Sequence, residues 1–314
     1  MKYIALIILI HAVTACQKQA ESIDSHVPIQ YEPTRVDHVI SANITYDRHM
    51  PHESAAITAV PNNVAPWASS LFIIDERKQL LRGSLDTGAF KLIATNVNDM
   101  VPLARKNAAG VIMALTSDNT LRGYIETNDQ GDYEEISFVK TLQNFNGFCK
   151  TETLKEQRIY GYDSHKPYTI DVINPSEKAR IEALVIETLP APTGKCLLTI
   201  SDNDIDMVQT PKNILSASLL ENNTLVFTTH ESLERPRLFI LKDGVTTAID
   251  ITGGLSTDAP SQIDSFTIIH DNLGGVLRNG AVVIADNASE RVIYISLDLL
   301  NRRLSETIVS VPQE

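Results

Sequence analysis

Two stretches of the sequence carry side chains of the kinds that bind metals. The run Asp-Asn-Asp-Ile-Asp at 202–206 alternates carboxylates, as calcium-binding loops do to supply oxygen ligands. It lacks the glycine that such loops have at their sharp turn, and Asn213 stands where the distal glutamate would be. His49 and His52 are three residues apart, but Pro51 between them prevents a shared helix face. We therefore interpret the run at 202–206 as a polar loop between strands and expect no metal role for the two histidines.

The motifs and the charge balance exclude other kinds of chemistry. The sequence has no Gly-x-Ser-x-Gly motif of the common serine hydrolases and no glycine-rich phosphate loop before a helix. It carries 27 basic and 39 acidic side chains in 314 residues, for a formal charge of −12. Because a protein that binds duplex nucleic acid needs a basic face, we expect no nucleic-acid partner. A phosphorylated small molecule remains compatible with this charge, since a local basic pocket overrides the global field.

The N-terminus has the order of a bacterial secretory signal. Lys2 precedes an apolar run at 4–10, which is too short to span a bilayer, and Val-Thr-Ala-Cys follows at 13–16. These four residues resemble a lipobox, in which the cysteine becomes the lipid-modified N-terminus of the mature protein. The sequence therefore predicts a membrane partner through a lipid anchor at Cys16, and Gln17 favours the outer membrane. The alternative is an ordinary cleaved signal with an incidental cysteine.

The rest of the chain divides into a polar segment and a long body. Residues 16–43 contain few adjacent apolar residues and no helical period, so we expect a tether that lifts the body off the membrane. The body at 44–314 has the length of one large domain. We thus predict a signal peptide at 1–15, a tether at 16–43 and one domain at 44–314, in a protein that is a monomer.

The body is predicted to be all-β. Short runs rich in Ile, Val, Leu and Thr recur between turn signals such as Leu-Asp-Thr-Gly and Lys-Asp-Gly. These runs lie at 70–75, 91–96, 110–116, 168–173, 196–200, 224–229, 237–241, 281–286 and 291–297. The segment 178–189 comes closest to a helical period, although its centre suits a strand equally well. Trp67, the only tryptophan, is interpreted as packing at the start of a strand.

Repetition in the strand pattern indicates a β-propeller. A unit of strand, turn, strand and Asp or Asn turn returns at roughly 40 to 50 residues, the usual length of a blade. Four phrases are typical of the third strand of a blade and its turn, at 80–88, 121–131, 238–244 and 292–300. We expect six blades, with five as the alternative.

Cys149 and Cys196 are the remaining cysteines of the sequence. In an oxidising periplasm they could form a disulfide that ties adjacent blades together. The alternative is that both are small buried apolar side chains.

Most of the body resembles the β-propeller phytases, which are secreted calcium-dependent phosphomonoesterases with six blades. Residues 70–88 are similar to that family's first complete blade, and Thr-Asn-Val-Asn-Asp-Met at 95–100 resembles the segment that follows it. Further similar stretches occur in family order at 111–136, 146–173, 220–241 and 261–287. The resemblance implies a site at the top of the central channel.

The resemblance also implies a set of phosphate-binding side chains. Arg77 and Lys78 occupy the position of the family's Lys-Lys pair, and Lys166 falls where a middle blade carries a lysine. In the family such side chains stabilise the negative oxygens of the phosphate. The arginine that the family has before Asn119 is missing here.

Calcium is the cofactor that the resemblance implies, and it would need six to eight hard oxygen ligands. The acidic residues at the matching positions are Glu53, Asp99, Glu221, Glu231 and Asp264. Other ligand positions of the family carry Ala, Ser, Leu, Thr or Asn, so the metal-binding set is eroded. The loss of these metal ligands argues against catalysis, but it does not affect the predicted fold.

Three functions therefore remain open for this sequence. One is a lipoprotein whose phytase-like propeller binds phosphorylated ligands and hydrolyses them. Another is a catalytically silent propeller that acts as a binding or scaffold module in the cell envelope. The third is an unrelated propeller enzyme such as a lactonase, although we find no Glu, Asn, Asn and Asp set for its single metal.

Overall fold

The structure is a computed structural model that describes residues 36–309 with short internal gaps. The gaps are residues 51, 86–87, 106–109, 128–131, 139–144, 153, 155–157, 174–177, 193, 202–203, 209, 211–213, 222–223, 230–234 and 255. All the described residues belong to one unit, Tyr31–Glu314. The predicted lipid anchor at Cys16 and the predicted ligand Glu231 lie outside the described residues.

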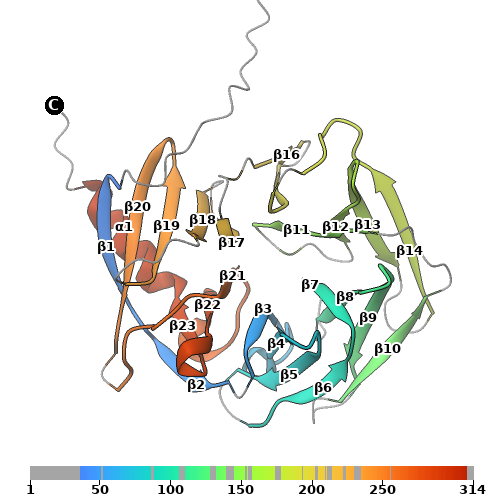
Figure 1. The fold of residues 1–314 in the computed structure, drawn as a ribbon, viewed down its shortest axis with the longest axis horizontal. Helices are drawn as coiled ribbons and strands as arrows, with labels where there is room; N and C mark the ends of the chain where they lie inside the picture. The colour runs from blue at the N-terminus through green and yellow to red at the C-terminus, as the bar shows by residue number, and fades with distance from the viewer. Residues whose placement is uncertain are drawn as a thin grey trace, which may run out of the picture. The chain divides into compact units, whose positions relative to one another are not determined.

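Four-stranded antiparallel sheets follow one another along the chain as the blades of a propeller (Figure 1). Blade 1 consists of β3 (Ser54–Val60), β4 (Ser70–Asp75), β5 (Leu80–Ser84) and β6 (Lys91–Ala94). Blade 2 consists of β7 (Val97–Leu103), β8 (Val111–Thr116), β9 (Leu121–Glu126) and β10 (Tyr133–Phe138). Blade 3 consists of β11 (Gly147–Thr151), β12 (Arg158–Tyr162), β13 (Pro167–Ile173) and β14 (Lys178–Val185).

The last two blades each include a strand from the start of the described chain. Blade 4 consists of β17 (Ile214–Leu220), β18 (Thr224–Thr229), β19 (Arg237–Lys242) and β20 (Val245–Thr252), and β1 (His38–Asn43) adds a parallel outer strand. Blade 5 consists of β21 (Ser265–Ile269), β22 (Ala281–Asp286) and β23 (Arg291–Ser296), and β2 (Tyr46–His49) completes it. Pairing of β2 with β23 therefore closes the ring by joining early and late parts of the chain.

The described part of the chain has five complete blades, the alternative that the sequence left open, and does not show the expected sixth. Around the ring, the innermost strands contact one another in the order β3, β7, β11, β17, β21 and back to β3. Between blades 3 and 4, β15 (Leu197–Ile200) and β16 (Ile205–Met207) form only a two-stranded ribbon. This ribbon pairs with the inner strand β11, so it extends blade 3 instead of forming a separate blade.

Apolar side chains between successive blades form the core. One cluster joins blades 4 and 5 and includes Ile240, Ile249, Ile284 and Ile293. Similar clusters lie between blades 5 and 1, 1 and 2, and 2 and 3. Each fully buried side chain of this size contributes about 1.5–3 kcal/mol through removal of apolar area from water. The continuous apolar runs of the sequence are thus strands buried on both faces.

The two ends of the described chain differ from the sequence prediction. The predicted tether extended to residue 43, but β1 already begins at His38, because its side chains Ile40 and Ala42 are buried in blade 4. The phrase at 292–300 begins with a strand as expected but continues into the helix α1 (Leu297–Val309). Leu297 and Leu300 are buried against blades 4 and 5, at the spacing of one helix face.

Short 3₁₀ helices at Pro66–Ala68, Gly275–Leu277 and Asn287–Ser289 lie in the loops. Among the described residues, no helix has the length and apolar character needed to cross a bilayer.

Candidate functional site

The inner strands of neighbouring blades advance in the same direction. Ser216 of β17 donates to the carbonyl of Phe266 on β21 at 3.3 Å, and two residues further on Ile268 N donates to Ser218 Oγ at 3.3 Å. We call the end of the ring where inner strands begin the upper face and the end where they finish the lower face. Because strands alternate in direction within a blade, the turns β4–β5, β12–β13 and β22–β23 lie on the upper face.

Most of the predicted site residues lie on the upper face. Glu53, Asp99 and Asp264 lie at or near the starts of β3, β7 and β21, and Arg77, Lys78 and Lys166 lie in upper turns. Glu221 is different, because it follows the last residue of β17 and is therefore exposed on the lower face. The sequence could not show which end of a strand a flanking residue occupies.

The upper face brings together Glu53 and Asp264 with a residue that the sequence reasoning missed. Glu76, in the β4–β5 turn, has its pKa raised by a side-chain hydrogen bond to Glu53, by the charge of Glu53, and to a lesser extent by Asp264. Burial raises the pKa of Asp264, and the charges of Asp286 and Glu53 act in the same direction. Carboxyl groups from blades 1 and 5 therefore meet at the upper face. The available signal was the pair Asp75-Glu76 directly after a buried strand.

The side chain of Asn287 holds the start of β3 against blade 5. Its Oδ1 accepts the N–H of Ser54 at 2.8 Å, and its Nδ2 donates to the carbonyl of Ser54 at 3.2 Å. The N–H of Asn287 in turn donates to Asp264 Oδ2 at 2.9 Å. This bridge fixes Glu53, next to Ser54, close to Asp264.

The described residues do not fit a calcium centre of the kind that the resemblance implies. Nowhere among them do three or more His, Cys, Asp or Glu side chains come close enough together to hold a metal ion. Calcium needs six to eight oxygen ligands, whereas among the described residues the charges of Asp264 and Asp75 act on Glu76 of the pair Glu53–Glu76 only at a distance.

The three predicted basic residues have different surroundings. Arg77 is exposed in the β4–β5 turn. Lys78 adopts a left-handed backbone conformation (φ 60°) in that turn, and its Nζ donates to Asn98 Oδ1 of blade 2 at 2.8 Å. Lys166 donates to the carbonyls of Glu187 and Leu189 at 3.1 and 3.3 Å, so it holds the segment that follows β14.

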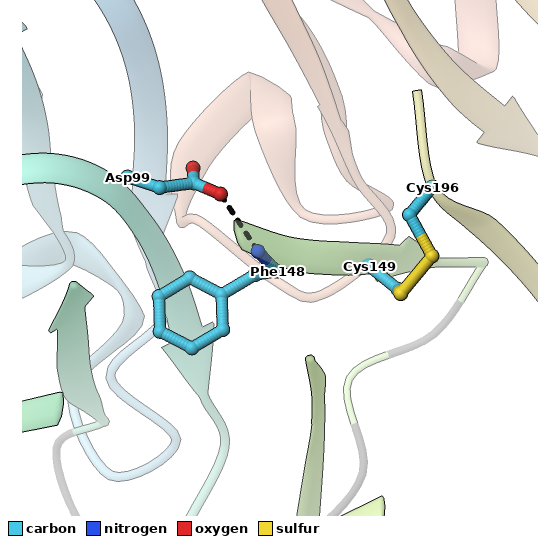
Figure 2. Close-up of a disulfide and its surroundings, with 4 residues drawn as sticks. All are labelled: Asp99, Phe148, Cys149 and Cys196. Atoms are coloured by element: carbon cyan, nitrogen blue, oxygen red, sulfur yellow. Dashed lines mark hydrogen bonds between the residues drawn. A yellow bond between two sulfur atoms is a disulfide. The ribbon is translucent and has the colours of Figure 1, made fainter. Parts of the chain in front are cut away.

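Asp99 joins blade 2 to blade 3. Its Oδ2 accepts the N–H of Phe148 on β11 at 2.7 Å (Figure 2). Its Oδ1 accepts the N–H of Met100 at 2.8 Å. Burial raises the pKa of Asp99 in spite of these two hydrogen bonds. Both carboxylate oxygens are thus engaged with the backbone.

Lys150, which the sequence reasoning did not single out, extends this chain of contacts to the next two blades. Its Nζ donates to the carbonyl of Ala217 on β17 at 3.2 Å and to that of Phe266 on β21 at 3.4 Å. Burial lowers the pKa of Lys150 to about 8, against the opposing effect of Asp99.

Cys149 and Cys196 form a disulfide, which is the first of the two alternatives that the sequence left open (Figure 2). Their Cα atoms are 4.4 Å apart. Cys149 lies on β11 and Cys196 directly precedes β15, so the bond ties the two-stranded ribbon to blade 3.

A groove of about 690 Å³ lies between blades 1 and 2. Its polar lining includes Asn96, Ser117, Asp118, Arg122, Tyr133 and Glu135. The groove reaches the upper face, because Ser117 Oγ donates at 3.1 Å to the same Asn98 Oδ1 that accepts from Lys78.

Arg122 is the cation within this groove. Its Nη1 donates to Glu135 Oε2 at 3.2 Å, and the charge of Glu135 raises the pKa of Arg122. The Nε of Arg122 is buried and makes no hydrogen bond with the described residues. A buried donor without an acceptor is costly, and the Arg122 side chain as a whole is 41% exposed.

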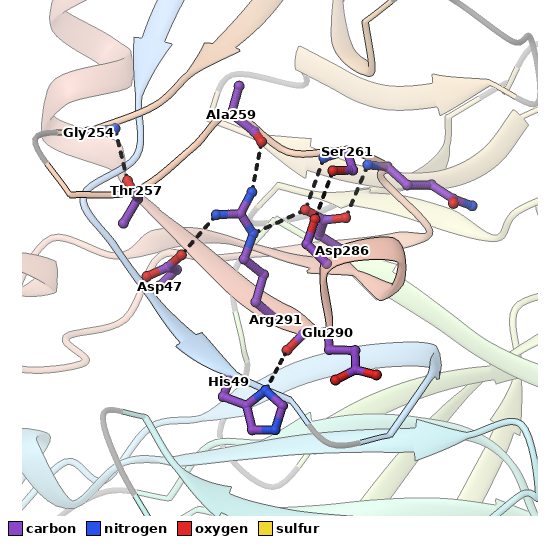
Figure 3. A network of polar contacts seen from close by, with 11 residues as sticks. Asp47, His49, Gly254, Thr257, Ala259, Ser261, Asp286, Glu290 and Arg291 are labelled. Carbon is purple, nitrogen blue, oxygen red and sulfur yellow. Dashed lines mark hydrogen bonds and ion pairs between the residues drawn. The ribbon is translucent and has the colours of Figure 1, made fainter.

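A polar network beside the site fastens the closing blade. Arg291 on β23 donates to Asp47 at 3.0 Å, to Asp286 at 3.2 Å and to the carbonyl of Ala259 at 2.8 Å (Figure 3). Asp286 is fully buried and also accepts the N–H of Ser261 at 3.0 Å. The network connects β2, the β22–β23 turn and the segment before β21.

Comparisons with known proteins bear on the fold. No protein-family model matches the chain. The chain also matches no curated protein. Among solved structures, the WD40 repeats of RRP9 are 10% identical with a TM-score of 0.48, over 82% of this chain and 99% of that one. The Cps50 (Swd1) β-propeller domain of Myceliophteria thermophila is 9% identical with a TM-score of 0.43, over 80% and 99%.

A Saccharomyces cerevisiae structure of Dbp5 bound to Nup159 and Gle1 also matches, at 14% identity and a TM-score of 0.28. The match covers 72% of this chain, and this chain spans only 62% of that one. Such values carry no inference about function. The strand topology and the ring of contacts between inner strands show that the chain is a β-propeller protein.

Proposed function

We propose that this chain is a cell-envelope lipoprotein whose propeller binds an anionic small molecule in the groove between blades 1 and 2. The signal-like N-terminus with Cys16 supports export and anchoring. The Cys149–Cys196 disulfide supports the same location, because disulfides persist in oxidising compartments such as the periplasm.

The guanidinium of Arg122 in the lining of the groove is the observation that carries the binding function. The groove has a volume in the range of small-molecule sites, and the side chain of Arg122 in its lining is 41% exposed. Lys78, connected to the groove through Asn98 and Ser117, adds a second cation at its rim. Arg122 and Lys78, at a groove that is also lined by the carboxylates of Asp118 and Glu135, are the groups that would bind a carboxylate or phosphate group of the ligand. Phosphorylated ligands are the class that the phytase resemblance implies.

Calorimetric titration of the full chain with phytate and with inorganic phosphate tests this function. We expect Arg122→Ala to weaken binding about tenfold or more, because a charge-assisted hydrogen bond contributes about 1.5–3 kcal/mol. The matched control is Arg237→Ala, which removes a similar cross-strand ion pair, with Asp250 on blade 4, outside the groove. Equal affinity in the two variants, or no binding to the unaltered protein, would contradict the proposal.

A second candidate function is hydrolysis of phosphomonoesters, which the carboxyl pair Glu53–Glu76 favours. A carboxyl group with a raised pKa beside a second carboxylate is suited to proton transfer. Arg77 and Lys78 follow Glu76 in the same turn and could hold a phosphate.

Phosphate release from phytate and from p-nitrophenyl phosphate, with and without calcium, tests this second candidate. We expect Glu76→Gln with Asp264→Asn to abolish any release. Glu221→Gln serves as the control, since that acid lies on the lower face and should leave the rate unchanged. Release that persists in the double variant excludes the upper-face carboxyls as its source.

A further inference from the structure

The tryptophan of this protein is displayed on the surface. Trp67 lies in the 3₁₀ helix Pro66–Ala68 between β3 and β4, and its side chain is 78% exposed. The expectation that it packs at a strand start is therefore wrong. Val64 in the same loop is 63% exposed, and Val276 in the β21–β22 loop is 65% exposed. We call Val64, Trp67 and Val276 the apolar patch.

The loop that carries Trp67 is held in place by its own hydrogen bonds. Asn62 Oδ1 accepts the N–H groups of Val64 at 3.1 Å and of Ala65 at 2.9 Å. The N–H of Ala68 donates to the carbonyl of Ala65 at 2.7 Å. A large apolar side chain is thus exposed to water in an ordered loop, although this exposure is unfavourable.

The β21–β22 loop packs directly against this loop. Gly274 has a φ of 89°, and a Cβ at this position would lie 2.9 Å from the backbone nitrogen of Trp67. Only glycine allows this approach, which brings Val276 to the side of Trp67. Two adjacent blades therefore build one patch.

The apolar patch and the N-terminal end of the described chain lie on the same face. Both loops follow the ends of inner strands, β3 and β21, and so belong to the lower face. The strand β1 runs parallel to β20, with His38 opposite Thr247, and the N–H of Asp37 donates to the carbonyl of Thr246. Since β20 begins at the lower face after the Lys242–Val245 turn, the chain enters the propeller there.

We infer that the lower face docks on the lipid bilayer through the apolar patch, with Trp67 at the level of the headgroups. This inference rests on the lipid anchor at Cys16 proposed above. About 20 residues separate Cys16 from the first described residue, which limits the reach to about 70 Å even when fully extended. The tether from this anchor joins the propeller on the same face as the apolar patch. Tryptophan favours the interface between lipid and water because its ring is apolar and its N–H is polar.

This docking would turn the upper face, with the groove and the carboxyl pair, away from the bilayer. The formal charge of −12 argues against attraction to anionic lipid, so the contact depends on the patch itself. Vesicles of zwitterionic phosphatidylcholine are accordingly the appropriate probe.

Fluorescence of the single tryptophan tests the inference on the full lipidated chain in phosphatidylcholine vesicles. We expect brominated phosphatidylcholine to quench Trp67, and we expect quenching by aqueous acrylamide to fall at least twofold relative to Cys16→Ser protein without vesicles. The double variant Val64→Asp, Val276→Asp should lose most of the quenching by brominated lipid. Leu184→Asp, at a 63% exposed leucine on the outer strand β14 of blade 3, should keep it.

The failures of the anchor and of the docking are distinguishable. Labelled palmitate that is not incorporated, or whose incorporation survives Cys16→Ser, removes the anchor and with it the basis of the inference. If palmitate is incorporated through Cys16 but acrylamide quenches Trp67 equally with and without vesicles, the docking is overturned. Protection from acrylamide without quenching by brominated lipid also overturns it, and assigns the patch to a protein partner.

Discussion

The carboxylate of Asp99 on β7 accepts the backbone N–H of Phe148 on β11 at 2.7 Å, and so joins blade 2 to blade 3 (Figure 2). Lys150, two residues further along β11, reaches the carbonyls of Ala217 and Phe266 in blades 4 and 5. Polar side chains of the inner strands thus connect four of the five blades near the channel. Asp99 and Lys150 have side chains of the kinds that catalyse reactions in other proteins, but in this protein they connect the blades of the ring.

Removal of the Asp99 carboxylate should destabilise the fold. In Asp99→Ala the N–H groups of Met100 and Phe148 lose their acceptors, and we expect the free energy of unfolding to fall by about 2–3 kcal/mol. Asp99→Asn keeps one carbonyl oxygen and should cost less. Urea unfolding of both variants measures the difference. An unchanged midpoint in Asp99→Ala would show that the two hydrogen bonds do not stabilise the ring.

Lys150 should make stability depend on pH in the alkaline range. Burial lowers its pKa in the folded state to about 8 from the usual 10.5, while the nearby charges of Asp99 and Lys195 have opposite effects. Between these values the unfolded chain binds more protons than the folded one, so the free energy of unfolding rises with pH, by roughly 3 kcal/mol. Below pH 8 both states are protonated and this rise is absent.

Urea unfolding at several pH values between 7.5 and 10 measures this rise. Lys150→Met should remove it, whereas Lys242→Met, at an exposed lysine that ends β19, should preserve it. The same slope in all three proteins would assign the pH dependence to other groups.

Loss of the disulfide should destabilise the ring between blades 3 and 4, where the two-stranded ribbon lies. Cys149 and Cys196 are 47 residues apart, and closing a loop of that length stabilises a fold by about 4 kcal/mol in the chain-entropy model. We expect the variant Cys149→Ala, Cys196→Ala to unfold at lower denaturant by a comparable amount. Hydrogen exchange should quicken first at Leu197 and Leu198, which pair with β11. Unaltered exchange there, with unaltered stability, would show that the bond is not formed in solution.

The blades were predictable from sequence because the signals that specify them are local. The runs at 70–75, 224–229 and 281–286 coincide with β4, β18 and β22, since apolar strands and Asn, Asp or Gly turns are encoded by neighbouring residues. The phrases at 80–88, 121–131 and 238–244 do begin with the third strands of their blades, β5, β9 and β19.

The site depends on contacts between blades, which a single sequence does not encode visibly. Glu76 matters only because Asn287, more than 200 residues away, holds the start of β3 and therefore Glu53 beside it. Glu221 was grouped with Glu53 by resemblance, although the direction of β17 places it on the lower face. The prediction that Trp67 is packed rested on the general preference of tryptophan for burial. The loop fixed by Asn62 instead holds this side chain in an exposed position.

Arg291 should be among the residues most important for stability. Its side chain is 12% exposed and its partner Asp286 is fully buried, so Arg291→Met leaves a carboxylate without its cation (Figure 3). Breaking a buried ion pair from one side costs about 3–5 kcal/mol. Arg303→Met, which removes a pair with Glu306 whose side chains are both more than half exposed, should cost well under 1 kcal/mol. Thermal unfolding of the two variants separates these expectations, and equal melting temperatures would contradict them.

The pKa of Glu76 should report directly on the carboxyl pair. Because the hydrogen bond to Glu53 is the largest cause of its elevation, Glu53→Gln should lower the pKa of Glu76 toward its usual range. Asp264→Asn should lower it by a smaller amount, since Asp264 acts only through its charge. Carbon-13 NMR titration of the glutamate carboxyls measures both shifts, and Glu221→Gln on the opposite face should produce neither. A pKa of Glu76 that is unaffected by Glu53→Gln would show that the two carboxyls do not meet, and would remove the basis for proton transfer at the upper face.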